Sequence, residues 1–187
     1  GGVISSNSSE VLVKLAEKLN CPVTTTVMGW GAFPPDHPLN LHILGMHGSK
    51  YANVAINEAD LVVAVGVRFD DRVTGKVSEF IKHGKIIHID VDRTELNKNK
   101  PVTLPICADL RHALGQLLDC AEPGDYSEWV ATCQGNRQAW PLDFVDDRKL
   151  RPQYAIRLLS DMTGGEALVS VGVGQHQMWA MQHYLTR

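Results

Sequence analysis

Apolar residues follow two different spacings along the chain. Residues 60–66 and 85–90 are almost continuously apolar and rich in β-branched side chains. Such runs predict strands of a parallel sheet that is covered on both faces. Residues 11–19 instead repeat apolar side chains at helical spacing, after a capping segment at Asn7-Ser8-Ser9. The alternation of these two patterns predicts an α/β fold with a parallel sheet and crossover helices.

The remaining segments continue this alternation. Further strands are predicted over residues 22–28, 102–106 and 167–171. Pro101 and Pro105 bound the second of these and favour a position near the sheet edge. Residues 34–38 contain three prolines, which exclude helix and ladder pairing and predict a loop. Helices are predicted over residues 49–59, 108–121 and 126–140, from Pro152 onward, and from Gly174 through Trp179.

Composition divides the chain into three parts. The pattern changes at Glu122-Pro123-Gly124, so residues 1–122 form a first unit. Residues 123–151 supply a polar helix and a charged linker, and residues 152–187 begin a second α/β unit. The chain starts without methionine and stops inside a predicted helix. We therefore expect it to be a piece of a longer protein.

Composition and charge argue against several function classes. The 187 residues carry a formal net charge of −3 and no basic stripe, which gives no support for binding nucleic acid or an anionic membrane. The longest apolar runs, such as residues 61–67, are far too short to span a bilayer. The four cysteines are widely spaced and form no C-x-x-C pair. We expect four buried or inert thiols in a reducing compartment, with neither a metal site nor a disulfide framework.

Glycine, arginine and carboxylate residues follow the predicted strands, within residues 24–29, 66–72, 90–92 and 107–109. Ligands of open parallel sheets bind outside the carboxyl ends of the strands, so these segments predict one shared crevice. Arginine suits a pyrophosphate, carboxylates suit ribose or adenine donors, and glycines permit close backbone approach. The sequence thus predicts a nucleotide-sized anion site in an α/β domain.

Each of these residues also has a purely structural explanation. Asp90 and Asp109 can cap the helices predicted to follow them. Arg68 and Arg72 can form local ion pairs with the two aspartates between them. No G-x-G-x-x-G string follows a predicted strand, so an ordinary dinucleotide fingerprint is not supported.

Two other polar segments are candidates. His47 lies in an apolar loop between glycines, where an imidazole is either structural or a partner for a bound ring. Gln175 and His176 begin a predicted helix directly after a predicted strand. A helix start can receive an anion, whereas the structural alternative is a first turn that faces water. No G-x-S-x-G, P-loop or H-E-x-x-H string occurs, which disfavours hydrolase and phosphoryl-transfer chemistry.

Four strings together resemble the catalytic subunit of the acetohydroxyacid (acetolactate) synthase family. The resemblance runs along essentially the whole chain, and the last two strings are highly specific. The strings are Thr26-Val27-Met28-Gly29-Trp30-Gly31-Ala32-Phe33-Pro34, Leu44-Gly45-Met46-His47-Gly48, Gly66-Val67-Arg68-Phe69-Asp70-Asp71-Arg72-Val73-Thr74-Gly75-Lys76 and Gly174-Gln175-His176-Gln177-Met178-Trp179.

The resemblance implies a fold and an activity. Residues 1–122 would form a Rossmann-like, parallel-sheet central domain that binds FAD and lacks its first strand. Residues 152–187 would be the N-terminal part of the domain that binds the thiamine diphosphate pyrophosphate. The family condenses two pyruvates, or pyruvate and 2-ketobutyrate, to 2-acetolactate or 2-aceto-2-hydroxybutyrate with release of CO2, in the biosynthesis of valine, leucine and isoleucine. It uses thiamine diphosphate, Mg²⁺ and an FAD that is structural.

The resemblance also implies site residues. The glutamate that activates thiamine diphosphate and the ligands of Mg²⁺ would lie outside this chain, so no catalytic or metal residue is expected within it. Gln175 and His176 match positions beside the thiamine diphosphate pyrophosphate. Met46, His47, Asp71 and Arg72 match the rim of the substrate and inhibitor channel. FAD contacts fall on Gly2, Thr26, Val27, Leu44, Gly45, Met46, His47, Gly66, Val67, Arg68, Phe69, Asp70, Asp90, Val91, Asp109 and Leu110.

Partners and alternatives follow from the same resemblance. It implies 2-keto acid substrates, a homodimer or homotetramer, and in some members a regulatory small subunit. The parent enzyme would be cytoplasmic in a prokaryote and plastidial in a plant or alga. A related thiamine-diphosphate decarboxylase or oxidase remains an alternative, as does a stand-alone flavin- or nucleotide-binding module.

Overall fold

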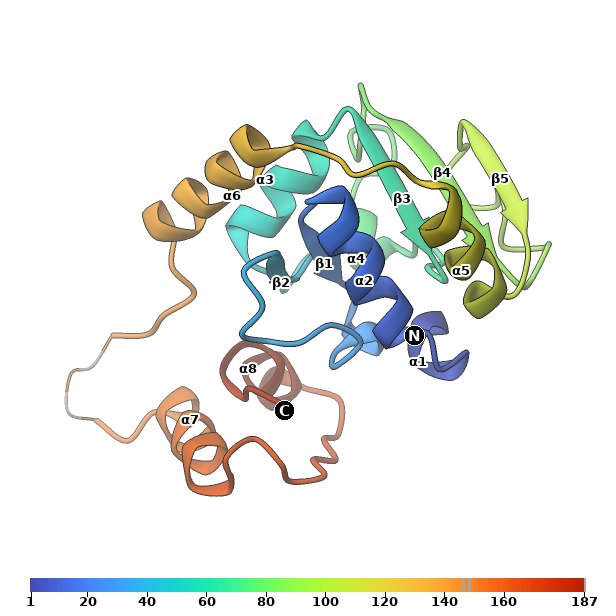
Figure 1. The fold of residues 1–187 in the computed structure, drawn as a ribbon. Coiled ribbons are helices and arrows are strands. Elements are labelled where there is room, and N and C mark those ends of the chain that lie inside the picture. Colours follow the sequence, from blue (N-terminus) through green and yellow to red (C-terminus); the bar gives the residue numbers. More distant parts are fainter. Residues whose placement is uncertain (146, 148, 187) are drawn as a thin grey trace.

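The computed structural model describes residues 1–145, 147 and 149–186. An α/β body holds the strands, and two helices, α7 (Pro152–Thr163) and α8 (Gln175–His183), pack against each other below it (Figure 1). The helix α8 also contacts the strand β2 (Asn40–Ile43) of the body. The second helical unit is therefore not detached from the body.

The strands of the described residues form two parallel sheets. The larger sheet has the order β3 (Leu61–Val65), β4 (Lys85–Asp90), β5 (Leu104–Cys107), with Leu61 paired to Lys85 and Ile87 paired to Leu104. The smaller sheet pairs β1 (Val23–Thr25) with β2. The helix α3 connects β2 to β3, while turns and loops without an α-helix connect β4 to β5. The predicted α/β class with a parallel sheet is confirmed.

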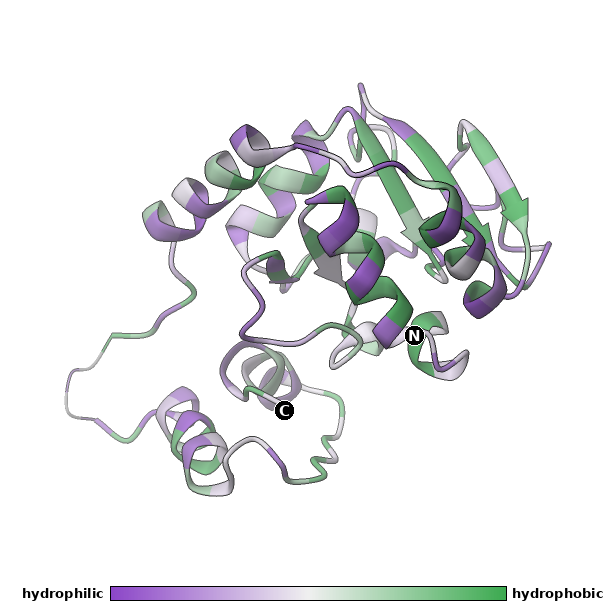
Figure 2. Ribbon diagram, in the orientation of Figure 1, coloured by the Kyte–Doolittle hydropathy of each residue, from purple (hydrophilic) through white to green (hydrophobic). Residues whose placement is uncertain are grey.

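The main core lies between the larger sheet and α3 (Lys50–Glu58). Val62, Ala64 and Ile86 point from the strands toward Tyr51 and Ala52 of the helix, and all of them are at most 9% exposed. A buried aliphatic side chain of this size contributes about 1.5–3 kcal/mol, so this layer stabilises the body. Figure 2 shows the corresponding hydrophobic strands beside helices whose outer positions are hydrophilic.

A second core cluster covers the other face of the sheet near its carboxyl end. Ile89 of β4 packs there with Leu110 and Ala113 of α5 (Leu110–Cys120) and with Val3 of α1 (Gly2–Ser5). The helix α2 (Ser9–Leu19) packs alongside α5. This cluster fixes the chain start against the strand ends.

Local capping sets the helix boundaries that the sequence predicts. The side chain of Ser49 accepts a hydrogen bond from the Ala52 N–H and begins α3, and Asp109 does the same for α5 through the His112 N–H. Pro152 occupies the first turn of α7, where its missing N–H has no consequence. The helix α6 (Ser127–Ala139) packs on α3 and buries Cys133. These four helices confirm the helical pattern.

Two strand predictions need correction at their ends, and one strand was not predicted. The strand predicted over residues 22–28 stops at Thr25, because the backbone turns at Thr26 into a 3-10 helix, η1 (Val27–Gly29). The strand predicted over residues 102–106 is shifted to β5, although its position at the sheet edge is confirmed. β2 was not predicted, since it is only four residues long and follows a proline-rich loop.

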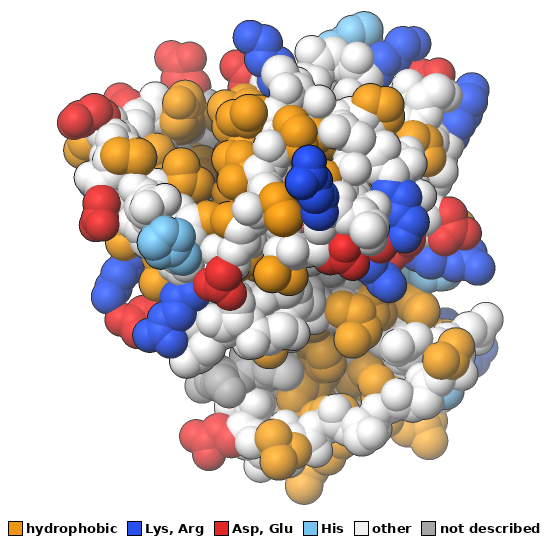
Figure 3. All heavy atoms as spheres, turned by 90° about the vertical axis from the view of Figure 1, so that its right-hand side faces the viewer, with side chains coloured by type: hydrophobic (Ala, Val, Ile, Leu, Met, Phe, Trp, Pro, Cys, Tyr) orange, Lys and Arg blue, Asp and Glu red, His pale blue; other side chains and the backbone are white. Residues whose placement is uncertain are grey.

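Two further predictions are wrong. Residues 167–171 do not form a strand, and Leu168 is fully exposed, because a strand needs a hydrogen-bonded neighbour and the described part of residues 152–186 contains none. The larger sheet is covered on its second face only near the carboxyl end. Leu61 and Val63 of β3 are 48% and 41% exposed on the face opposite α3. Figure 3 shows hydrophobic side chains gathered on both the upper body and the lower helical pair.

Candidate functional site

Two glycines bring the chain start to the carboxyl end of β3. The Gly66 N–H donates to the carbonyl of Ile89 (2.9 Å), and the Gly2 N–H donates to the carbonyl of Gly66 (3.4 Å). A Cβ built on Gly66 would lie 2.7 Å from the Gly2 Cα, and Gly66 has a φ of +58°. Only glycine tolerates both this approach and this φ without strain. Leu110 of α5 lies against the same point through its Cδ1.

Arg68 and Asp90 place opposite charges beside this contact. Both side chains lie near enough to Gly1 for their charges to act on it, Arg68 as a cation and Asp90 as an anion. Asp90 is 8% exposed and its carboxylate accepts from the Asp92 N–H (2.9 Å). Asp90 therefore closes a turn and caps no helix, whereas the capping alternative holds for Asp109. Val91 follows at the tip of β4 and is mostly exposed.

Thr26 and Val27 reach the same region through η1. A Cβ on Gly29 would lie 3.5 Å from both the Gly1 nitrogen and the Thr26 Oγ1, so this turn adjoins the chain start. The structure thus brings together strand-end residues of β1, β3, β4 and β5, as the sequence predicts.

The loop after β3 contains the local ion pairs that were the structural alternative. Arg68 lies 3.9 Å from Asp70, and Arg72 lies 4.0 Å from Asp71, with both arginine side chains about two-thirds exposed. Exposed pairs at such distances contribute under about 1 kcal/mol. Asp70 has a second role, since its side chain accepts from the Val73 N–H and begins α4 (Asp71–Thr74).

His88 holds this loop from inside the sheet. Its Nε2 lies 2.8 Å from the carbonyl oxygen of Val67, and the ring is fully buried edge-on against Phe69. A carbonyl only accepts, so Nε2 donates this hydrogen bond. Among the described residues Nδ1 has no partner. The side chain of Asn99 donates to the carbonyl of Arg68 (2.9 Å) and fixes the next residue.

A second loop, after β2, is tied to the first. The Met46 N–H donates to the carbonyl of Arg72 (2.8 Å), and an Arg72 guanidinium nitrogen lies 3.7 Å from the Met46 sulfur. Gly45 has a φ of +97° where the two loops touch. Gln182 of α8 donates to the carbonyl of His47 (2.9 Å). Of the predicted channel rim, Met46 and Arg72 are thus in contact, and both side chains are exposed.

Gln175 and His176 lie in the exposed first turn of α8. The described contacts do not join them to the strand-end residues around Gly66. Sequence reasoning missed the residues that hold the loops by their backbone, namely His88, Asn99, Gln182 and Asn53. A lone polar side chain on a helix or strand has no distinguishing sequence signal.

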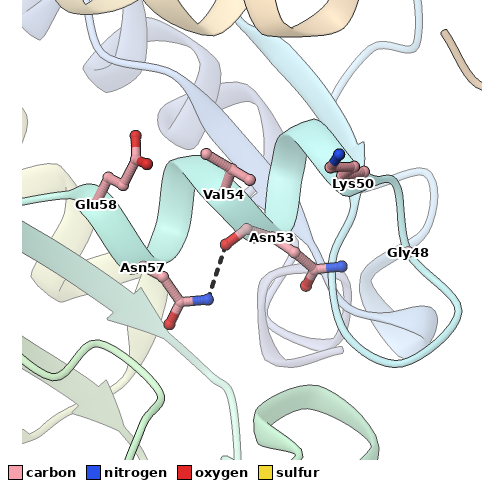
Figure 4. A pocket seen from close by; sticks show the side chains of 6 residues that line it. All are labelled: Gly48, Lys50, Asn53, Val54, Asn57 and Glu58. Carbon is pink, nitrogen blue, oxygen red and sulfur yellow. Dashed lines mark hydrogen bonds between the residues drawn. The ribbon is translucent and has the colours of Figure 1, made fainter. Parts of the chain in front are cut away.

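Neither a hollow, a metal-binding group nor a membrane-spanning helix of the described residues extends this site. A shallow hollow of about 510 Å³ runs along α3 between Gly48 and Glu58, where the Asn57 side chain donates to the carbonyl of Asn53 (2.8 Å; Figure 4). In the part of the chain that is described, no group of three His, Cys, Asp or Glu residues is placed to hold a metal ion. None of the described helices has the length and apolar character needed to cross a bilayer.

Comparison with known proteins decides the family. The family described as thiamine pyrophosphate enzyme, central domain, matches residues 1–117. The chain belongs to this family. The family resemblance seen in the sequence and the predicted fold class are both confirmed.

Curated relatives extend the likeness beyond the central domain. The chain is 47% identical to probable acetolactate synthase 2, chloroplastic, of Oryza sativa subsp. japonica, over all of this chain and 30% of that protein. It is 46% identical to acetolactate synthase 2, chloroplastic, of Zea mays, over 95% of this chain and 29% of that protein. It is 44% identical to acetolactate synthase, chloroplastic, of Arabidopsis thaliana, over 95% of this chain and 28% of that protein. The chain spans less than a third of the length of these relatives.

Proposed function

We propose that the whole protein is an acetolactate synthase, and that this chain supplies its central domain and the beginning of its thiamine-diphosphate domain. The main observation in support is that the chain is 44–47% identical, along nearly its whole length, to relatives that are all named acetolactate synthase. The reaction joins two pyruvates, or pyruvate and 2-ketobutyrate, with loss of CO2. A related decarboxylase or oxidase is less well supported, because it would not account for this identity.

The carboxyl ends of the strands, around Gly66, Arg68 and Asp90, are the proposed FAD site, and their residues fit such a group. Gly2 and Gly66 pack against each other and so bring two backbone segments together at the strand ends, Arg68 offers a cation for a pyrophosphate, and Asp90 offers a carboxylate. Bound FAD would bridge the tips of several strands and thereby stabilise the central domain. Asp109 contributes through its backbone and position, since its carboxylate already accepts from the His112 N–H.

The first turn of α8 is the proposed contact for the thiamine diphosphate pyrophosphate. The N–H groups of this turn lack partners within the helix, and a helix N-terminus favours negative charge. Gln175 and His176 are exposed there and supply additional polar groups. Thiamine diphosphate would supply the carbanion chemistry, while these residues would bind and orient it. The activating glutamate and the ligands of Mg²⁺ would come from other parts of the protein.

The contact between Met46 and Arg72 supports the proposed channel rim. Met46 is 57% exposed, so the two side chains present a paired apolar and cationic surface beside the crevice. His47 and Asp71 would complete this rim. A cation at the mouth suits carboxylate substrates such as 2-keto acids.

Assembly and location complete the proposal. Leu158, Leu159 and Met162 of α7 are 43%, 49% and 76% exposed, which supports burial against further protein in a dimer or tetramer. The proposal includes a regulatory small subunit as an additional partner. In a plant or alga the protein would act in plastids, since the relatives named above are called chloroplastic.

The product formed from pyruvate by the full-length protein tests this proposal. The protein is purified, saturated with thiamine diphosphate, Mg²⁺ and FAD, and supplied with pyruvate. Acetolactate as the main product is expected. Acetaldehyde or acetate as the main product would establish the decarboxylase or oxidase alternative. FAD that stays bound to the protein through gel filtration supports the proposed FAD site at the strand ends. Complete loss of FAD from the protein would contradict that site.

A further inference from the structure

A second hollow lies between the α/β body and the helical pair and is lined by residues of both. It measures about 410 Å³, and its lining comes from β2, α3, α6, the segment after α6, α7 and α8. Figure 1 shows α8 beneath the body on the side where the chain passes from α6 to α7. None of the residues proposed above to bind FAD, thiamine diphosphate or substrate lines it. Two arginines do, Arg137 of α6 and Arg157 of α7.

Arg137 faces a neutral histidine. Its guanidinium nitrogens lie 3.2 Å from the His42 Nε2 and 3.4 Å from the carbonyl oxygen of Asn40. A guanidinium only donates, so the His42 Nε2 must accept and carry no proton. Burial, followed by the charge of Arg137, lowers the pKa of His42 to about 4. At neutral pH the histidine is therefore uncharged and the arginine is the cation.

Arg157 repeats this arrangement from the other side. Its guanidinium lies 3.4 Å from the His183 Nδ1 and 3.4 Å from the Asp143 carboxylate. Burial and then Arg157 lower the pKa of His183, so this ring is also uncharged at neutral pH. The Asp143 side chain is 62% exposed, and a solvated pair of this kind is weak.

The backbone of His42 is strained at the edge of this hollow. His42 has a φ of +59° inside β2, a conformation that costs about 1–3 kcal/mol for a residue other than glycine. Two neighbours enforce it. The His42 N–H donates to the Asn40 side chain (2.7 Å), and the Thr24 hydroxyl donates to the His42 carbonyl (2.8 Å). Strain that is held in place in this way concentrates at functional sites.

We propose that the hollow binds a small oxyanion, a carboxylate or a phosphate, between Arg137 and Arg157. The hydrogen bonds of both guanidinium groups are 3.2–3.4 Å long, beyond the usual value of about 2.9 Å. An oxyanion would offer each planar fork shorter, charge-assisted bonds. A volume of about 410 Å³ lies within the range of small-molecule sites. Because Arg137 belongs to the body and Arg157 to the helical pair, the anion would cross-link the two.

Titration calorimetry on the full-length protein tests this site. The protein is first saturated with thiamine diphosphate, Mg²⁺ and FAD, so that the proposed cofactor sites are filled. Orthophosphate, pyrophosphate and succinate are then titrated separately. Saturable binding of at least one probe is expected, and the choice between the phosphates and succinate identifies the source of the oxyanion. No saturable binding of any probe would overturn the proposal.

Three variants test whether the anion binds in this hollow. Arg137→Gln and Arg157→Gln should each weaken the binding of the probe about tenfold or more, which is the loss of one charge-assisted contact. Arg111→Gln, an exposed arginine of α5 outside the hollow, is the matched control and should bind like the wild type. Thermal midpoints measured without added anion show whether each variant is folded. Wild-type affinity in a folded Arg137→Gln or Arg157→Gln protein would also overturn the proposal.

Discussion

The side chain of Asn53 holds the backbone of Gly45 from both sides. Its Oδ1 accepts from the Gly45 N–H (2.8 Å), and its Nδ2 donates to the Gly45 carbonyl (2.9 Å). Asn53 belongs to α3 and Gly45 to the loop that carries Met46 and His47. A helix of the core therefore sets the position of a loop at the proposed site.

Replacement of Asn53 should release this loop. Asn53→Leu removes both hydrogen bonds. The Gly45 N–H is left unpaired, whereas the Gly45 carbonyl still accepts from the Gly48 N–H (3.0 Å). We expect a cost of about 1–3 kcal/mol in the free energy of unfolding. Urea titration followed by circular dichroism measures this change. Asn57→Leu, one turn further along α3, removes one bond to the Ile81 N–H and one to the Asn53 carbonyl and serves as the comparison for a loss of helix-surface contacts. If only Asn53→Leu lowers the affinity for pyruvate, the loop position matters to the site.

A methyl group at Gly45 should be poorly tolerated. The added Cβ would collide with the carbonyl oxygen of Arg72, and Gly45 has a φ of +97°. We expect Gly45→Ala to lower the free energy of unfolding by about 1–3 kcal/mol. Gly115→Ala is the matched control, since Gly115 lies in α5 with nothing within 4 Å of its added Cβ, and it should stabilise by about 0.5–1 kcal/mol. Equal effects of the two substitutions would contradict this account.

The tether from His88 to Val67 should affect FAD binding as well as stability. His88→Leu removes the donor to the Val67 carbonyl, whereas His88→Gln can retain one. We expect His88→Leu to lose about 1–3 kcal/mol of stability and to bind FAD more weakly. Flavin fluorescence titration measures the affinity, and His88→Gln should recover most of it. Unchanged FAD affinity in a folded His88→Leu protein would show that loop 66–69 does not position the flavin.

Arg68 should contribute to FAD affinity directly. If its guanidinium pairs with the pyrophosphate, Arg68→Ala weakens FAD binding by about 1–3 kcal/mol, or roughly 5- to 150-fold. Its ion pair with Asp70 is long and exposed, so the thermal midpoint should hardly move. Arg111→Ala is again the control. An unaltered FAD affinity in Arg68→Ala would remove this residue from the site.

Acid should destabilise the fold through His42. Its folded pKa is lowered to about 4 by burial and by Arg137, below the unfolded value near 6.5. The unfolded state therefore binds the proton more readily, and stability present above pH 6.5 is lost as the pH falls toward 4. The loss is at most about 3 kcal/mol. Unfolding curves between pH 7 and pH 4 measure it, and His42→Gln should flatten part of the slope; an unchanged slope would contradict the role of His42.

Sequence patterns determined the elements whose signals are local. Asp109 and Ser49 cap the helices that were predicted after them, and the apolar runs of β3 and β4 pair in parallel as expected. The same local reading located Gly66, Arg68 and Asp90 at strand ends, because the carboxyl ends of parallel strands meet at one edge of a sheet. Capping and periodicity act over a few residues, so the sequence states them directly.

Tertiary structure decided what depends on distant partners. Residues 167–171 have the composition of a strand but no neighbouring strand in the described chain, while residues 40–43 form β2 because β1 lies beside them. The tethers from Asn53, His88 and Gln182 likewise join residues far apart in sequence. A strand or a buried hydrogen bond forms only with its partner. The local sequence does not specify which distant residue becomes that partner in the folded chain.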